Sequence, residues 1–133
     1  MDLTRAVKGC KVSVKYTNYF KKSNGLYFNG ELPSVKVYTA PLLKITAHGQ
    51  KEVLYNKDLW ADAGYYGLVG MEDDGSWCII VDRGTSVYHS ILTKQTILHE
   101  MIHIKLTPYG RHGVKFKKQI RRIAALGALD TLI

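Results

Sequence analysis

The stretch that decides the fold of this chain runs from Thr93 to Leu106 and reads TKQTILHEMIHIKL. It begins with a threonine, which can cap a helix, and Pro108 and Gly110 follow it as residues that close a helix off. Within the predicted helix, His99 and His103 are four residues apart, so both imidazoles lie on one face, about 5–6 Å apart at Cβ. Two imidazoles at this spacing are able to bind one tetrahedral zinc ion.

The same helix carries an acid between the two histidines. Glu100 directly follows His99 and completes the pattern HExxH over residues 99–103. A glutamate in this position lies beside the first imidazole and is suited to act as general base for a metal-activated water. Two alternatives stand against a catalytic site. The pattern arises by chance in roughly half a percent of shuffled sequences, and a zinc site that only stabilises the fold has no need of Glu100.

A catalytic zinc needs a third protein ligand and an open fourth position. A thermolysin-like site takes a glutamate from a later helix, but no acid lies between Glu100 and Asp130. A metzincin needs a glycine and a histidine at positions 106 and 109, where this chain has Leu106 and Tyr109. The remaining downstream candidate is His112, which a turn over residues 107–110 can bring back toward the helix. We therefore predict His112 as the third ligand.

Other residues around this motif have weaker interpretations. Gly113 lacks a side chain where the backbone is expected to approach the metal. His48 and His89 are weaker ligand candidates and are expected to be surface or core histidines, and Tyr109 is expected to pack in its turn and not to assist the reaction. Zinc is the expected metal because three histidines with an open position suit it, although manganese or cobalt can occupy the same ligands.

The positive charge of the chain lies at its two ends. The sequence has 19 Lys and Arg against 11 Asp and Glu, a formal net charge of +8. Six basic residues and no acid lie between Arg5 and Lys22, seven basic residues and no acid lie between Met101 and Leu129, and the centre is acidic. If the ends pack side by side, one face carries most of the positive potential and can bind DNA phosphates. The alternative is a basic helix face that is merely solvated.

The remaining segments predict an α+β domain. A first helix is expected up to about Phe28, although Asn24-Gly25 inside it also fits a hairpin. The last helix has an apolar stripe with basic residues on its other side. The apolar stripe of that helix consists of Phe116, Ile120, Ile123 and Ala124. Strands are expected at residues 35–39 and 42–47, and a hairpin is expected at residues 65–71 and 77–81. We expect the helices to gather against one face of a mostly antiparallel sheet.

Length and composition place the chain among single-domain proteins without a membrane span. Its 133 residues fit one domain. The longest apolar run, Ile123–Leu129, is far shorter than the ~18 residues of a spanning helix, and residues 1–20 have no apolar core of a signal peptide. Cys10 and Cys78 lie far apart and form no CxxC motif. We therefore expect a cytoplasmic protein with reduced thiols.

The motif residues resemble the SprT-like zinc metalloprotease family, which includes the Spartan DNA–protein-crosslink proteases. The likeness is carried by HExxH at 99–103, followed by His112-Gly113 and Phe116, where the family has His-Gly-x-x-Phe. Further similar segments are YFNGELP at residues 27–33, Ala63-Gly64-Tyr65, and the strand at 77–81 before the HExxH helix. The resemblance covers about residues 12–125 and is closest to short, stand-alone members of the family.

This resemblance implies that residues 1–133 form one small gluzincin-like domain. It also implies a function for that domain. It implies that His99, His103 and His112 bind zinc and that Glu100 is the catalytic base. The expected activity is that of a zinc metallopeptidase that hydrolyses peptide bonds, acting on a protein or peptide substrate and on DNA-bound proteins in particular. Aromatic residues such as Trp60, Tyr65 and Tyr66 are expected in the core more often than stacked on bases. The alternative function is a zinc-stabilised DNA-binding module without peptidase activity.

Overall fold

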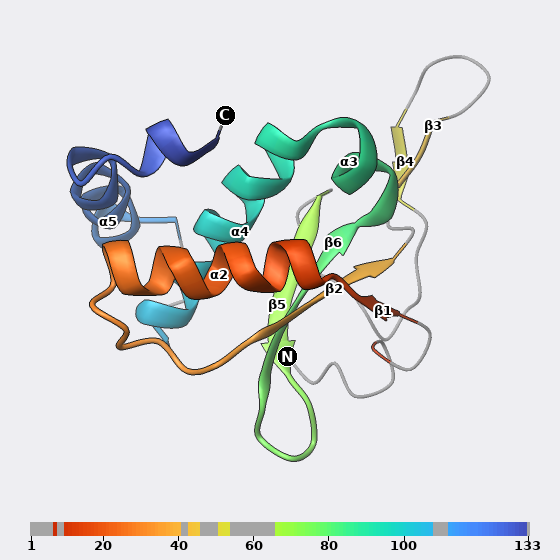
Figure 1. The fold of residues 1–133 in the computed structure, drawn as a ribbon, viewed down its shortest axis with the longest axis horizontal. Coiled ribbons are helices and arrows are strands. Elements are labelled where there is room, and N and C mark those ends of the chain that lie inside the picture. Colours follow the sequence, from red (N-terminus) through yellow and green to blue (C-terminus); the bar gives the residue numbers. More distant parts are fainter. Residues whose placement is uncertain are drawn as a thin grey trace.

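A computed structural model describes residue 7 and residues 10–40, 43–45, 51–53, 66–107 and 112–132 of the chain (Figure 1). In chain order the elements are β1 (Lys11–Val12), α2 (Val14–Tyr27), β2 (Lys36–Ala40), β3 (Leu43–Ile45), β4 (Lys51–Val53), β5 (Gly67–Met71), β6 (Trp77–Asp82), α3 (Arg83–Tyr88), α4 (Ser90–Lys105), α5 (Val114–Ala125) and the 3-10 helix η2 (Ala128–Leu132). The predicted α+β class is confirmed. The short elements β1, β4, α3 and η2 were not expected from the sequence.

The main sheet is mixed. Its strand order is β1-β2-β6-β5, and β3 and β4 form a separate antiparallel pair. The two outer pairs, β1 with β2 and β5 with β6, are antiparallel, but β2 and β6 run parallel with Val37 opposite Ile79. The expectation of a mostly antiparallel sheet therefore misses the central pair. The chain reaches β6 only after passing through β3, β4 and β5, and such a crossover delivers it in the same direction as β2.

The helices cover one face of this sheet, as predicted. Side chains alternate along a strand, so Val37, Ile79 and Val81 share one face and pack in a core with residues of α2, α4 and α5. We call this the helix face. Figure 1 shows α2 crossing in front of the strands. The opposite face carries a smaller buried cluster of Tyr38, Ala40, Leu68, Cys78 and Ile80.

Helix α2 continues through Asn24-Gly25, so the alternative hairpin at this dipeptide is wrong. Ser13 caps the helix by accepting a hydrogen bond from the Tyr16 N–H at 3.2 Å. The Asn24 side chain does not form a turn of its own. Its Nδ2 donates to the Leu32 carbonyl at 3.0 Å and its Oδ1 accepts from the Leu32 N–H at 3.1 Å. A helical asparagine thus holds the loop that leads to β2.

Helix α4 is the predicted HExxH helix, and it begins at Ser90 rather than at the expected cap. Thr93 lies inside the first turn, where its hydroxyl donates to the His89 carbonyl at 3.1 Å. This bond satisfies the buried hydroxyl without ending the helix. Gly67 lets the helix approach β5, because a Cβ at that glycine would lie 2.6 Å from the Thr96 methyl carbon. The helix therefore packs directly on the β5–β6 hairpin.

The hairpin itself is as predicted within the described residues. The N–H of Glu72 donates to the Ser76 carbonyl at 2.8 Å, and Gly75 adopts a positive φ of 84° in the turn. Tyr65, at the start of the predicted first strand, lies outside the described residues. β3 lies within the strand expected at 42–47, whose other residues are also outside them. Among the described residues, no helix is long and apolar enough to cross a membrane.

Candidate metal centre

Three histidines from two helices meet at one point. His99 and His103 are one turn apart on α4, and His112 lies two residues before α5. The Nε2 atoms of His99 and His103 are 3.1 Å apart, and the Nε2 atom of His112 is 2.9 Å from each of them. The structure thus brings together the three histidines that the sequence predicts as ligands, close enough to bind a metal ion.

These three contacts cannot all be hydrogen bonds. Each Nε2 of a neutral imidazole offers either one proton or one lone pair in the ring plane, so a closed triangle leaves nitrogens that repel one another. One metal ion bound by all three nitrogens would remove this repulsion. Three nitrogens bound to one tetrahedral zinc at about 2.0–2.1 Å lie about 3.3 Å apart, close to the observed 2.9–3.1 Å. The donor set fits a small divalent metal, and the geometry does not identify which one.

The electrostatics of the triad favour neutral imidazoles, which are the form that binds a metal. Burial, and then the neighbouring His103 and His112, lower the pKa of His99 to about 4. Burial and the neighbouring His112 also lower the pKa of His103. His112 is the exposed member of the triad. Solvent therefore reaches the site at His112.

Glu100 directly follows His99 in α4 and is buried. Glu100 is 7% exposed. Burial raises the pKa of its carboxyl to about 7 because desolvation penalises the charged form. A divalent cation held by the neighbouring imidazoles would favour the charged carboxylate. A carboxyl group with this balance is suited to exchange a proton near neutral pH.

The aromatic ring of Phe116 lies against all three imidazoles. Its centroid is 4.8 Å from that of His99, 4.9 Å from that of His103 and 4.7 Å from that of His112. Sequence reasoning assigned Phe116 to the apolar stripe of the last helix and, by resemblance, to a family motif. Neither signal predicted contact with every ligand, since that contact depends on how α5 packs against α4.

His89 does not join the triad. His89 is exposed at the junction of α3 and α4, and His48 and Tyr109 lie outside the described residues. Gly113 is not crowded by the described protein atoms. A Cβ there would meet no atom within 4 Å, and its φ of −93° suits any residue. Gly113 instead takes the N-cap position of α5.

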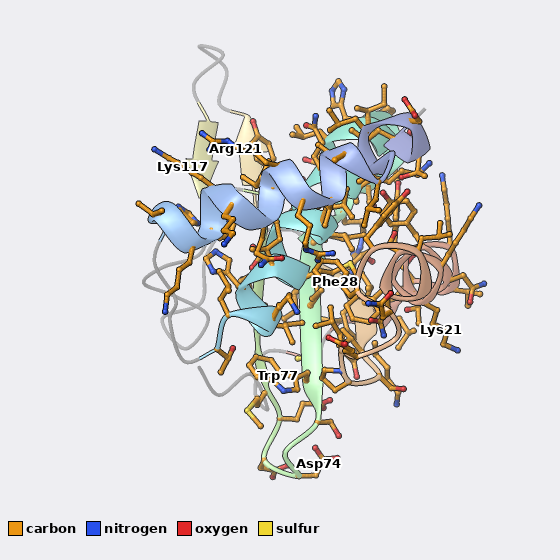
Figure 2. The ribbon with its side chains drawn as sticks, turned by 90° about the vertical axis from the view of Figure 1, so that its left-hand side faces the viewer. Lys21, Phe28, Asp74, Trp77, Lys117 and Arg121 are labelled. Atoms are coloured by element: carbon orange, nitrogen blue, oxygen red, sulfur yellow. The ribbon has the colours of Figure 1, made fainter. Side chains whose placement is uncertain are left out.

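The basic residues of α5 divide into two groups. Four of them are exposed: Lys115, Lys117, Lys118 and Arg121. Figure 2 shows Lys117 and Arg121 projecting from α5 into solvent. Arg122 was expected among them but is half-buried, because its Nη1 donates to the Tyr27 carbonyl at 2.6 Å and its guanidinium lies over the Phe28 ring. The apolar stripe of α5 is also narrower than the sequence predicted, since Ile120 is 44% exposed.

No protein-family model matches the chain, and no curated protein or solved structure matches it either. The resemblance to the SprT-like family therefore stays a prediction that depends on the motif residues.

Proposed function

We propose that this chain is a zinc-dependent metallopeptidase of the SprT-like type, with His99, His103 and His112 as the metal ligands. The observation that carries the proposal is the triangle of three Nε2 atoms 2.9–3.1 Å apart, with a buried glutamate next to the first ligand. A site that only stabilises the fold gains nothing from a buried carboxyl group at this position. A hydrolytic site needs one within reach of its water.

The roles of the residues follow from their chemistry. A bound zinc ion supplies a Lewis acid that activates water and polarises the peptide carbonyl. The three neutral imidazoles hold the ion and leave a further position open, because the described residues offer three ligands at this site. Glu100 accepts the proton of the attacking water and passes it to the leaving amine. Its buried environment favours this exchange near neutral pH.

An extended peptide substrate fits the outer edge of β5. β6 is unsuited to pairing with a substrate because β2 and β5 flank it on both sides. Among the described strands, β5 pairs with β6 alone and lies directly under α4. A peptide added to β5 would run beside the helix that carries His99 and Glu100. The expected substrate is thus an unfolded or extended protein segment.

The test is hydrolysis of a basic, loosely folded protein by the zinc-loaded chain. We expect one zinc ion per chain and cleavage that a chelator stops and added zinc restores. Glu100→Gln should retain its zinc and lose cleavage by at least about a hundredfold, the scale of general-base catalysis. Glu31→Gln is the matched control, because Glu31 is an exposed surface acid whose carboxylate is 3.6 Å from Lys105.

Two results would overturn the proposal. Full cleavage by Glu100→Gln removes Glu100 as the base, and a wild-type chain that binds no zinc removes the metal centre. Loss of cleavage in both Glu100→Gln and Glu31→Gln points to general damage, and zinc content with circular dichroism of each variant identifies that case.

A second function, DNA binding without peptidase activity, is favoured by the four exposed cations of α5, a helix that begins two residues after His112. It predicts binding to single-stranded DNA that weakens steeply with salt and is unchanged in Glu100→Gln. Cleavage by the wild type together with DNA binding would support a peptidase that acts on DNA-bound proteins. DNA binding with no cleavage of any protein would favour the module alone.

A further inference from the structure

Phe116 has a position in the fold that its role as a core residue does not explain. The six distances among the ring centroids of Phe116, His99, His103 and His112 all lie between 4.6 and 4.9 Å. The four rings therefore stand at the corners of a nearly regular tetrahedron, with the three imidazoles as its base. The phenyl ring lies over the centre of that base and is 3% exposed.

This arrangement gives the triad a closed and an open side. In a tetrahedron with these edges, the Phe116 centroid is about 4 Å from the plane of the imidazole centroids, which is van der Waals contact. No ion or water fits between them. A metal ion and its exchangeable ligand must therefore occupy the side of the triad opposite Phe116.

Within the described part of the chain, the three imidazoles lack the usual polar support. Histidines that bind metals normally donate their second ring N–H to a carboxylate or carbonyl, and this bond fixes the ring. Among the described residues, the polar contacts of the His99, His103 and His112 rings are those between their own Nε2 atoms. What they share instead is the phenyl ring, tilted by 57°, 45° and 59° to them. Tilted aromatic pairs at these distances attract one another.

We propose that Phe116 is a positioning residue that holds the three imidazoles with their Nε2 atoms converged before a metal binds. The proposal rests on the metal site of the proposed function and names what organises it. Phe116 also joins the two sources of ligands, because it lies in α5, four residues after His112, and contacts both histidines of α4. With the ring in place, the cost of ordering the three imidazoles is met in folding and not in metal binding.

The test measures metal binding by the full chain, not peptidase activity. Metal-free wild type and Phe116→Leu are titrated with zinc sulfate against a chromophoric chelator and, separately, with cobalt(II), whose visible absorption reports coordination geometry. We expect Phe116→Leu to bind zinc about 10- to 100-fold more weakly, the range for residues that orient metal ligands. Its cobalt bands should lose intensity as water replaces a displaced imidazole.

Three companion variants separate positioning from general packing. Phe116→Tyr keeps the ring and should restore the affinity and the cobalt spectrum of the wild type. Ile123→Val removes buried carbon from the same helix, away from the imidazoles, and should leave both readings unchanged. If Phe116→Leu does not fold, Phe116→Met is measured in its place with the same expected loss, because the longer and more flexible methionine side chain adapts to an irregular space without supplying a flat ring.

The outcomes are distinct from those of the proposed function. If the wild type binds zinc and the folded Leu or Met variant binds it equally well, with the same cobalt spectrum, the positioning role is wrong and the metal site stands. A loss of affinity in Ile123→Val as large as that in Phe116→Leu also overturns it. If the wild type binds no metal, the proposed function itself falls.

Discussion

Cys78 is a fully buried thiol on the face of the sheet opposite the helices. Burial, and then the nearby carboxylate of Glu72, raise the pKa of its thiol from 9.0 to about 12. The folded chain thus keeps a proton that the unfolded chain releases near pH 9. Stability from this group is complete below the unfolded pKa and is lost as the pH rises toward the folded one. We expect the urea midpoint of unfolding to fall between pH 8 and pH 10.

The control for this prediction is Cys78→Ala, which lacks the titrating group. Its midpoint is lower at every pH because the substitution leaves space in the core, but its decrease from pH 8 to pH 10 should be smaller than that of the wild type. An equal decrease in both chains would assign the pH dependence to other groups, such as Tyr19 and Tyr38, whose pKa values burial also raises.

At the scale of single residues, the sequence predicted what local geometry determines. His99 and His103 could be predicted as neighbours because four residues make about one helical turn, and that relation holds in any fold. His112 followed from the absence of other ligands downstream, and the structure brings it within 2.9 Å of both. The contact of Phe116 with the three imidazoles could not be predicted from the sequence. It depends on the packing of α5 against α4, and an apolar residue at helical spacing looks the same whether it touches an aliphatic core or three imidazoles.

At the scale of the elements, the side chain of Asn24 in α2 is hydrogen-bonded to the loop before β2, and one substitution removes these bonds. Asn24 makes two hydrogen bonds to the backbone of Leu32 and so orders the loop before β2. Asn24→Ala leaves these backbone groups without their partner, and we expect a loss of about 1–3 kcal/mol in the free energy of unfolding. Asn18→Ala, at an exposed position of the same helix, should change it by less than about 0.5 kcal/mol. Urea unfolding measures both, and equal values would show that these hydrogen bonds contribute nothing.

The same residue shows why element boundaries were harder to predict than elements. Asn-Gly is a turn signal because both residues accept a positive φ, but here the tertiary bonds to Leu32 outweigh that preference. Thr93 is similar, since its hydroxyl bonds to the preceding turn and the helix starts before it. The parallel pairing of β2 with β6 had no local signal, because strand direction is set by the path of the chain between the strands.

At the scale of the whole molecule, the histidine triad depends on long-range packing. Two of its histidines come from α4 and the third comes just before α5. α5 is held against α2 by the bond from Arg122 to the Tyr27 carbonyl. η2 is held by a hydrogen bond between the Tyr19 hydroxyl and Thr131 at 3.1 Å. The element that follows His112 is thus held in place by α2, so experiments on the triad use the full chain.

The distribution of charge over the folded chain gives a last prediction. The sequence left open whether the basic ends share one face, and Figure 2 shows Lys117 and Arg121 on one side of the molecule and Lys21 on another. The central acids also differ in role, since Asp82 is buried as the N-cap of α3. If single-stranded DNA binds beside the metal centre, it should follow α5, because that helix begins next to His112.

Two double variants remove the same charge from the two sides. For single-stranded DNA, the logarithm of the binding constant falls with the logarithm of salt concentration by about 0.7 for each phosphate neutralised. Lys117→Gln with Arg121→Gln should therefore lower this slope by about 1.4 and weaken binding. Lys21→Gln with Lys22→Gln, at exposed positions of α2, should leave the slope unchanged because these side chains are remote from the bound strand. Fluorescence anisotropy at several salt concentrations measures both slopes. Equal reductions would mean that DNA contacts both sides, and an effect of the α2 pair alone would exclude α5 as the binding surface.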